Sequence, residues 1–243
     1  MVKHIVILGS SYKTGNRIAL DFSYDKCKHD ELISILNDIK KSGNKKYSIA
    51  THTITTKTNK WSDVVNLDPF FKNVKLLDSK DKFLHYLKDD EETSALDIAN
   101  YISTYYNCTH TRLEKLVYYC YADYLCKYKE KLFNDAIYAF KYGPVISTIY
   151  EIYKNSDKSD FIKPIPNEYD MSIRSRILNS VNGLNKIKSI EETLDKYKYY
   201  NTATLISLTH QDNTPWAYSD KGTSAYKIIS DSDILKYHKY ETV

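Results

Sequence analysis

The spacing of hydrophobic and polar positions divides the chain near residue 90 into a mixed N-terminal part and a helical C-terminal part. In the first part, the run of Ile and Val over residues 3–8 is typical of a buried strand, and the β-branched residues over 46–56 favour a second strand. Apolar residues on one face predict a helix over 29–41, with Gly43 as its stop. The remaining elements expected there are a strand over 73–77 and a helix capped by Ser79.

The second part is predicted to consist of helices joined by loops. The acidic run Asp89–Glu92 that precedes it is typical of a solvated junction. The cleanest helical pattern starts at Thr111, which is expected to form a capping box with Glu114, and apolar residues follow at helical spacing as far as Leu125. Such a stripe is usually core. The other helices are expected to begin at Thr93 or Ser94, at Pro144, at Ser172 and at a second capping box of Ser189 with Glu192, and a last short helix holds Ile234, Leu235 and Tyr237.

A short apolar and aromatic segment without a polar face, residues 132–142, is expected to be an extended connector. Gly143 after it supplies backbone freedom, and Pro144 suits the first turn of a helix. Together these patterns predict an α+β protein. A small α/β unit is expected over 1–90 and a mainly helical domain over 93–243.

Composition narrows the classes of function. Hydrophobic residues make up 42% of the 243 positions and charged residues 27%, which is typical of a globular protein. No apolar run approaches the roughly 20 residues of a membrane span, and the apolar start Met1–Gly9 is too short for a signal peptide, so we expect a cytoplasmic protein and no membrane partner. The net charge is +4, but only four of the basic residues are Arg, the usual residue for bidentate phosphate recognition. Nucleic acid is therefore not expected as a partner.

The candidate chemical motifs are incomplete. The loop Gly9–Asn16 follows a strand, but its spacing departs from the phosphate-loop and Rossmann patterns, so an ordinary turn is preferred to nucleotide binding. His110 and His210 each stand beside Thr at a helix boundary, which favours histidines that bond backbone groups over a metal site or an acid–base pair. The four cysteines have no zinc spacing. No catalytic residue, metal ligand or cofactor is assigned, and the protein is not expected to be an enzyme.

Residues 95–240 resemble the Panacea domain family, the SocA-like antitoxin domain. Several short motifs carry this resemblance, and together they are specific because they occur in the family's order. The matching residues are Leu113-Glu114-Lys115-Leu116-Val117-Tyr118-Tyr119, then Leu132-Phe133, then Ala139-Phe140-Lys141-Tyr142-Gly143-Pro144-Val145, then Tyr150, and finally Leu208-Thr209-His210 with Pro215-Trp216.

The resemblance implies an antitoxin that neutralises a cognate toxin protein by direct binding, with a self-dimer as a further possible assembly. Two alternatives stay open: an adaptor that delivers a toxin to a protease, and a nucleotide-binding or enzymatic protein that uses the N-terminal unit. The resemblance does not extend to residues 1–90, so their role is open. The residues expected to be structural are Thr111, Leu113, Lys115, Leu116, Gly143, Pro144, Thr209 and His210. The aromatic residues expected to contact a partner are Tyr118, Tyr119, Tyr128, Tyr150 and Trp216, the last with an equal claim to be a core residue.

Overall fold

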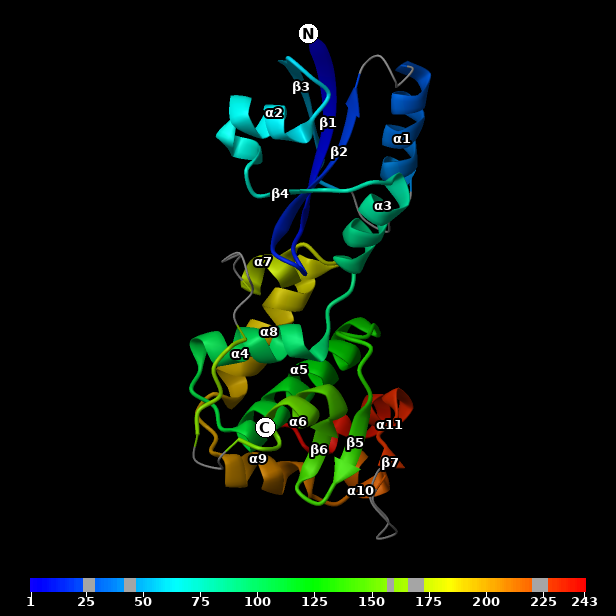
Figure 1. The fold of residues 1–243 in the computed structure, drawn as a ribbon. Coiled ribbons are helices and arrows are strands. Elements are labelled where there is room, and N and C mark those ends of the chain that lie inside the picture. Colours follow the sequence, from blue (N-terminus) through cyan, green and yellow to red (C-terminus); the bar gives the residue numbers. More distant parts are fainter. Residues whose placement is uncertain (24–28, 42–46, 157–159, 166–172, 220–226) are drawn as a thin grey trace. The chain divides into compact units, whose positions relative to one another are not determined.

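Two compact units make up the chain (Figure 1). A computed structural model describes residues 1–23, 29–41, 47–156, 160–165, 173–219 and 227–243. Helices account for 52% of the structure and strands for 17%, so the predicted α+β class is confirmed. The first unit consists of Met1–Glu92 and Pro166–Val181, and the second of Thr93–Ile165 and Asn182–Val243. The sequence placed residues 173–181 in the helical part, whereas in the structure they belong to the N-terminal unit. The predicted helix stop Gly43 and helix start Ser172 lie outside the described residues.

The first unit is built on a four-stranded sheet with the order β3-β1-β2-β4. Its strands are β1 (Val2–Ser11), β2 (Asn16–Ser23), β3 (Ala50–Thr56) and β4 (Val74–Leu76). β1 pairs antiparallel with both β2 and β3, while β2 pairs parallel with β4. The strands expected from the sequence are present, and β2 is an additional strand. It was missed because Arg17 and Asp21 break its apolar pattern, although it lies inside the sheet.

Alternating residues of β1 point to opposite faces of this sheet and nucleate two clusters. Ile7 packs with Ile39 and Phe83 of the helices on one face. Val6 packs with Val64 and Phe71 on the other. The elements that cover the two faces are α1 (His29–Lys41) and α3 (Lys80–Asp89) on the first, and α2 (Trp61–Leu67) with the short helix η1 (Pro69–Phe71) on the second, as Figure 1 shows. Ser79 caps α3 as predicted, because its side chain accepts a hydrogen bond from the Lys82 amide.

The acidic run lies at the boundary between the two units, but it is only partly solvated: Glu92 is exposed, whereas the two residues before it are buried, which corrects the expectation from their charge. Asp90 and Glu91 are 2% and 7% exposed. The two carboxylate oxygens of Asp90 each accept a 2.8 Å hydrogen bond, from the main-chain N–H of Tyr12 and of Lys13 in the β1–β2 turn. A second buried group, the Arg176 guanidinium, donates to the Asp90 carbonyl at 3.2 Å. Asp90 and Arg176 are thus buried while they satisfy main-chain groups of the turn and of the segment after α3, and the Glu91 carboxylate accepts a hydrogen bond from the Tyr47 hydroxyl.

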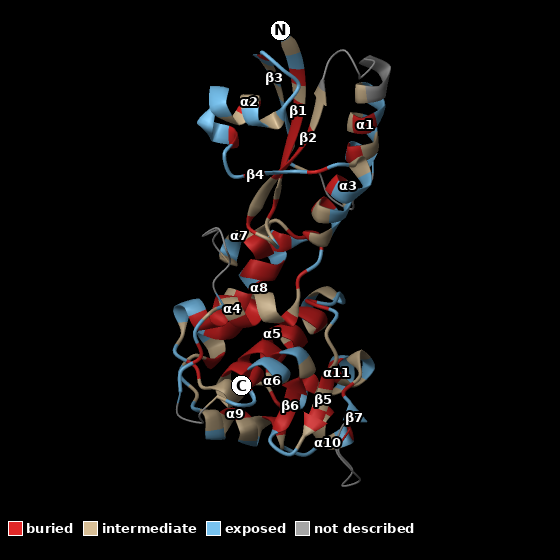
Figure 2. Ribbon diagram, in the orientation of Figure 1, coloured by how far each residue is buried: buried red, intermediate tan, exposed pale blue. Residues whose placement is uncertain are grey.

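The second unit surrounds one long helix, α5 (His110–Tyr128), that is buried almost all round (Figure 2). The predicted core stripe from Leu113 to Leu125 is confirmed, but the helix is not amphipathic, because both of its sides face neighbouring elements. The other helices of this unit are α4 (Ala95–Tyr105), α6 (Ser147–Tyr153), α8 (Gly183–Tyr197), α9 (Thr202–Thr209), α10 (Pro215–Ser219), α11 (Asp231–Tyr237) and the short η2 (His238–Tyr240), while α7 (Ile173–Leu178) belongs to the first unit.

Two predicted helix caps are wrong. α5 begins one residue before Thr111, and Glu114 bonds a neighbouring strand instead of a helix start. Ser189 is 2% exposed in the middle of α8, which begins six residues earlier. Both motifs occur by chance inside continuous helices, where burial overrides local capping preference. Ser94, in contrast, forms a complete capping box with Asp97 at the start of α4.

The segment expected to be an extended connector forms a β-hairpin, which Figure 1 shows beside α5. Its strands β5 (Ile137–Phe140) and β6 (Gly143–Ile146) are joined by Lys141 and Tyr142, and β7 (Lys227–Ile228) completes a sheet of order β6-β5-β7. Pro144 therefore lies in an edge strand and not in the first turn of a helix, which starts only at Ser147. An edge strand tolerates proline because its outward side carries no ladder hydrogen bond.

Candidate functional site: a motif cluster around the β5–β6 hairpin

Two adjacent charged residues of α5 hold the outer edge of β6. The Lys115 ammonium donates a 2.6 Å hydrogen bond to the Pro144 carbonyl, and the main-chain N–H of Ile146 donates to the Glu114 carboxylate at 2.9 Å. Glu114 and Lys115 are 2% and 1% exposed. Because an open strand edge leaves main-chain groups unpaired, this pair takes the place of a further strand.

The turn into β6 brings the main chain against the same lysine. Gly143 has a φ angle of +97°, which side chains other than that of glycine rarely adopt. A Cβ atom at this position would lie 2.6 Å from Thr209 Oγ1 and 3.1 Å from Lys115 Cε. The predicted need for glycine is therefore confirmed by both backbone angle and close packing.

The last motif, at the end of α9 and the start of α10, fastens the hairpin tip. The Trp216 indole N–H donates to the Phe140 carbonyl at 2.8 Å, and His210 Nε2 lies 3.1 Å from the Lys141 carbonyl oxygen. The His210 and Trp216 rings are 3.8 Å apart. His210 Nδ1 lies 2.7 Å from the Ile206 carbonyl oxygen, so both ring nitrogens contact main-chain oxygens and neither points to a metal site. The structure thus brings together the Lys115, Gly143–Pro144, Thr209–His210 and Trp216 motifs, which are far apart in the sequence.

The aromatic residues expected to contact a partner fall into two groups. Tyr118 and Tyr119 are fully buried, which corrects the expectation that they lie at the surface. The Tyr118 hydroxyl donates to Glu241 at 2.5 Å, and the Tyr119 ring stacks on Tyr197 with the centroids 4.2 Å apart. Tyr128, Tyr150 and Trp216 are half-buried, and the structurally expected residues Leu113 and Leu116 are fully buried while Thr111 is half-buried.

A buried network at the chain's C-terminal end was not foreseen from the sequence. His238 is 3% exposed, and its two ring nitrogens lie 2.7 Å from Glu241 and 2.8 Å from Asp123. Burial alone would lower the pKa of His238, but hydrogen bonds to Asp123 and Glu241 raise it to about 9. The same histidine holds the pKa of Asp123 below its usual value, although burial acts to raise it. Only the spacing of His238 and Glu241 at i and i+3 hints at this pairing in the sequence.

The charged groups of the cluster are enclosed and not arranged around a reacting molecule. Burial lowers the pKa of Lys115 to about 8, partly offset by Glu114 and Glu241. A lysine with such a pKa can act as a nucleophile when it lines a pocket, but Lys115 is 1% exposed and its nitrogen is bonded to Pro144. Within the described ranges, no group of three or more His, Cys, Asp or Glu residues could hold a metal ion. The geometry of this cluster fits a structural role.

The first unit contains an arrangement with the spacing of a catalytic triad. His4 Nδ1 lies 2.8 Å from Asp21, and His4 Nε2 lies 2.9 Å from Thr56 Oγ1. However, Nε2 also lies 3.0 Å from the Thr58 carbonyl oxygen, which can only accept a hydrogen bond. The Thr56 hydroxyl donates to the same Thr58 carbonyl, so its proton points away from His4, which therefore is not placed to remove it as a general base must. His4 is fully buried and joins strands β1, β2 and β3.

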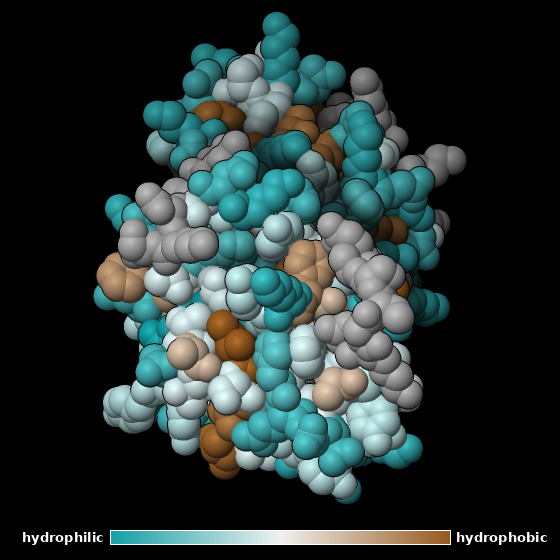
Figure 3. All heavy atoms as spheres, turned by 90° about the horizontal axis from the view of Figure 1, so that it is seen from below, coloured by the Kyte–Doolittle hydropathy of each residue, from teal (hydrophilic) through white to brown (hydrophobic). Residues whose placement is uncertain are grey.

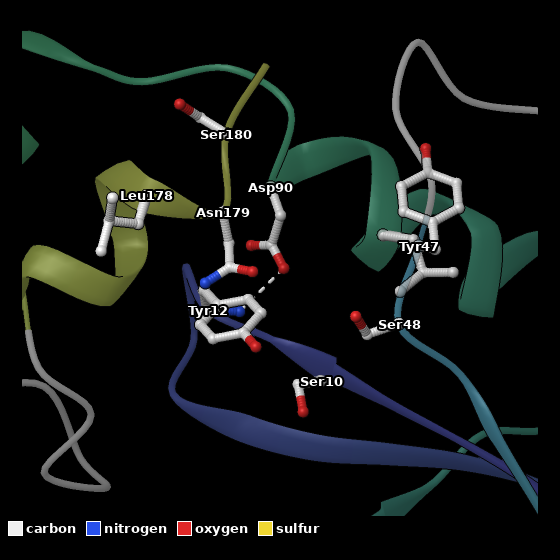
Figure 4. A pocket seen from close by; sticks show the side chains of 9 residues that line it. Ser10, Tyr12, Tyr47, Ser48, Asp90, Leu178, Asn179 and Ser180 are labelled. Carbon is white, nitrogen blue, oxygen red and sulfur yellow. Dashed lines mark hydrogen bonds between the residues drawn. The ribbon is translucent and has the colours of Figure 1, made fainter. Parts of the chain in front are cut away.

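A polar cavity of about 160 Å³ in the first unit tests the nucleotide-binding alternative (Figure 4). The turn residues Ser10 and Tyr12 line it, together with Asp90 and Asn179 from other segments. No lysine or arginine is among the described residues that line this cavity. In Figure 4 the Tyr12 main-chain N–H donates a hydrogen bond to the Asp90 carboxylate. This N–H is therefore not free to bind a phosphate, which main-chain donors of such a turn would have to hold. The cavity therefore does not favour a nucleotide.

Comparison with known proteins gives one match. No curated protein and no solved structure matches the chain. No helix within the described part of the chain is long and apolar enough to cross a membrane. The motifs that converge on the β5–β6 hairpin lie within a single matched region: residues 113–217 match the family model of the antitoxin SocA-like Panacea domain.

Proposed function

We propose that this protein is the antitoxin of a toxin–antitoxin pair and neutralises its cognate toxin by direct binding. The observation that carries the proposal is the Panacea match over residues 113–217, whose motif residues are used to build the fold. Because these motif residues are engaged in packing and in hydrogen bonds within the domain, we expect the domain to act through its surface residues. The protein is then a binding partner in the cytoplasm and not an enzyme, and it covers the toxin's active or substrate-binding surface.

The surface of the protein is compatible with such a role. The face in Figure 3 carries only small, separated hydrophobic areas among hydrophilic and near-neutral residues. Interfaces between proteins that also exist alone are commonly of this mixed kind, with a few aromatic anchors. A toxin–antitoxin complex of one-to-one or two-to-two stoichiometry is expected, with a dissociation constant of about nanomolar or lower.

The test is co-expression of the full-length chain with the reading frame that neighbours it in its native locus. Expression of that reading frame alone should arrest growth, and the full-length chain should restore growth and co-purify with the product. If the chain neither restores growth nor co-purifies, the antitoxin proposal is wrong. A fall in the amount of toxin, without a stable complex, would favour the protease adaptor instead.

The N-terminal unit is proposed to contribute to neutralisation, and its test must keep the chain intact. A chain starting near Thr93 would lack most of the first unit but keep Ile177, which is fully buried in that unit and would become exposed to solvent. Leu67→Ser in the full-length chain is a better probe, because this side chain is 60% exposed on α2. Weaker toxin binding by this variant, with an unchanged melting temperature, would support the contribution, whereas unchanged binding would count against that face.

A further inference from the structure

Three tyrosines from α10, α11 and η2 gather at the surface of the second unit. Tyr218 and Tyr237 stack with their ring centroids 3.8 Å apart and their planes at 13°. The pKa of Tyr218 is raised, mainly by its hydrogen bond to Tyr237. Tyr240 follows Tyr237 by three residues, in the adjoining η2. Tyr218 is 39% exposed and Tyr240 45% exposed, so the group is open to a partner.

Two lysines accompany these rings. The Lys236 ammonium lies 4.8 Å from the centroid of the Tyr237 ring, and the Lys239 ammonium 5.0 Å from that of Tyr240. Both lysines are exposed, and neither forms an ion pair with a carboxylate among the described residues. The group therefore carries positive charge over aromatic surface.

The acidic residues at the start of the same helix offset only part of this charge. Asp231 pairs with Lys131 at 3.1 Å and accepts the Tyr121 hydroxyl at 2.7 Å. Asp233 accepts the Ser230 hydroxyl at 2.6 Å as part of the helix cap. Asp231 is thus paired with a lysine outside the group, whereas Asp233 acts electrostatically on Lys236. Lys239 has no ion pair with a carboxylate among the described residues.

The opposite side of this segment is fixed to the core. Ile234 is fully buried, and His238 is held between Asp123 and Glu241. A side chain on a fixed element loses less conformational freedom on binding than one on a loose loop. The exposed tyrosines and lysines are therefore presented in one arrangement before a partner arrives.

We propose that Tyr218, Tyr237, Tyr240, Lys236 and Lys239, here named the Tyr–Lys surface, bind an acidic segment of the cognate toxin. This inference rests on the proposed antitoxin function and assigns its contact surface. Tyrosine is a frequent anchor at protein interfaces because it buries a large area and keeps a polar tip. The two ammonium groups select carboxylates and disfavour a basic partner.

A protein partner fits this surface better than nucleic acid. Single-stranded nucleic acid stacks its bases on open aromatic faces, whereas Tyr218 and Tyr237 stack on each other. The charged groups are lysines without an arginine, and so they lack the planar fork that recognises phosphate with two bonds.

The test compares two matched pairs of residues in full-length protein. Lys239→Glu with Tyr240→Ala alters the Tyr–Lys surface. Lys198→Glu with Tyr199→Ala alters a similar neighbouring pair elsewhere, where the lysine lies 5.3 Å from the ring centroid and the tyrosine is 87% exposed. Each variant is titrated with purified toxin by isothermal calorimetry at low and high salt. Circular dichroism and melting temperature establish that each variant is folded.

We expect the Tyr–Lys variant to bind the toxin about 30-fold more weakly, as loss of an interface hot spot does, and to lose most of the salt dependence. The matched control should bind within about threefold of the unaltered chain. Equal binding by both variants overturns the assignment of the surface, while failure of the unaltered chain to bind overturns the antitoxin proposal itself. Binding of a single-stranded oligonucleotide that is lost in the Tyr–Lys variant would assign the surface to nucleic acid and overturn the inference.

Discussion

The ammonium of Lys115 and the carbonyl of Pro144, 29 positions apart in the chain, form a buried hydrogen bond of 2.6 Å. Glu114 makes the matching bond to the Ile146 amide, so one turn of α5 satisfies both kinds of main-chain group on β6. The Glu114–Lys115 motif and the Gly143–Pro144 motif, which the sequence predicts to be parts of two separate helices, therefore contact each other in the structure.

Replacing Lys115 with methionine should destabilise the second unit at neutral pH. Methionine has a similar length but no donor, and an unpaired buried carbonyl costs about 1–3 kcal/mol. Urea denaturation at pH 7 measures the free energy of unfolding. The control is Lys127→Met on the same helix, where the lysine is 44% exposed, and a change below about 1 kcal/mol is expected there. Equal effects of the two substitutions would contradict the role of Lys115.

The same substitution should change how stability depends on pH. The pKa of Lys115 falls from 10.5 to about 8 on folding, so between these values the unfolded chain binds more protons than the folded chain. Stability from this group therefore rises with pH above 8. The gap between the unaltered chain and Lys115→Met should widen by about 2 kcal/mol between pH 7 and 9.5. A gap that is constant over this range would show that the lysine is not buried as described.

Gly143→Ala should destabilise the protein by about 1–3 kcal/mol through its positive φ angle, and further through contact of the new Cβ with Thr209. The two causes can be separated. Thr209→Ala removes the Oγ1 atom that would lie 2.6 Å from the Cβ atom, but it leaves the backbone angle unchanged. In a double-mutant cycle measured by thermal unfolding, Thr209→Ala should therefore recover part of the loss and not all of it. Full recovery would mean that backbone strain is absent.

Burial in the helical unit is predicted well for residues such as leucine, whose side chains are wholly apolar. Leu113 and Leu116 are buried as their spacing indicates. Tyr118 and Tyr119 were placed at the surface because tyrosine is amphipathic, and nothing near them in the chain shows that Glu241 accepts the Tyr118 hydroxyl 123 residues away. Long-range pairing of this kind cannot be read from periodicity.

Strands of the first unit were harder to predict than helices for a related reason. The apolar run in β1 is visible because both sides of the strand are buried. β2 carries Asp21 on a buried position, where His4 pairs with it, and this charge hides the strand. Asp90 and Glu91 of the acidic run were misread in the same way, since a charged residue is expected in solvent until its partner is known.

Removing His238 should cost about 3–5 kcal/mol, because the buried Glu241 and the half-buried Asp123 would be left without their shared partner. His238→Gln keeps hydrogen-bonding groups but cannot carry a proton. The pKa of His238 is raised from 6.5 to about 9, so its stabilising contribution is complete below pH 6.5 and is lost as pH rises to 9. The unaltered chain should lose stability over this interval relative to the variant, as measured by urea denaturation at pH 6, 7.5 and 9. Parallel pH profiles for the two chains would contradict the buried network.

Asp90→Asn should loosen the β1–β2 turn without disturbing the second unit. The Asp90 carboxylate accepts the amides of Tyr12 and Lys13 with one oxygen each, whereas asparagine offers a single acceptor oxygen and turns its NH₂ group toward the other amide. One buried donor is then unpaired, at a cost of about 1–3 kcal/mol. Amide hydrogen exchange followed by NMR should show faster exchange at Tyr12 or Lys13. Asp89→Asn is the matched control, because the Asp89 carboxylate makes a 3.5 Å ion pair with the exposed Lys13 side chain and lies 3.7 Å from His85, and such surface pairs contribute less than about 1 kcal/mol each. If both variants leave exchange at the turn unchanged, the burial of the acidic run has another cause than support of this turn.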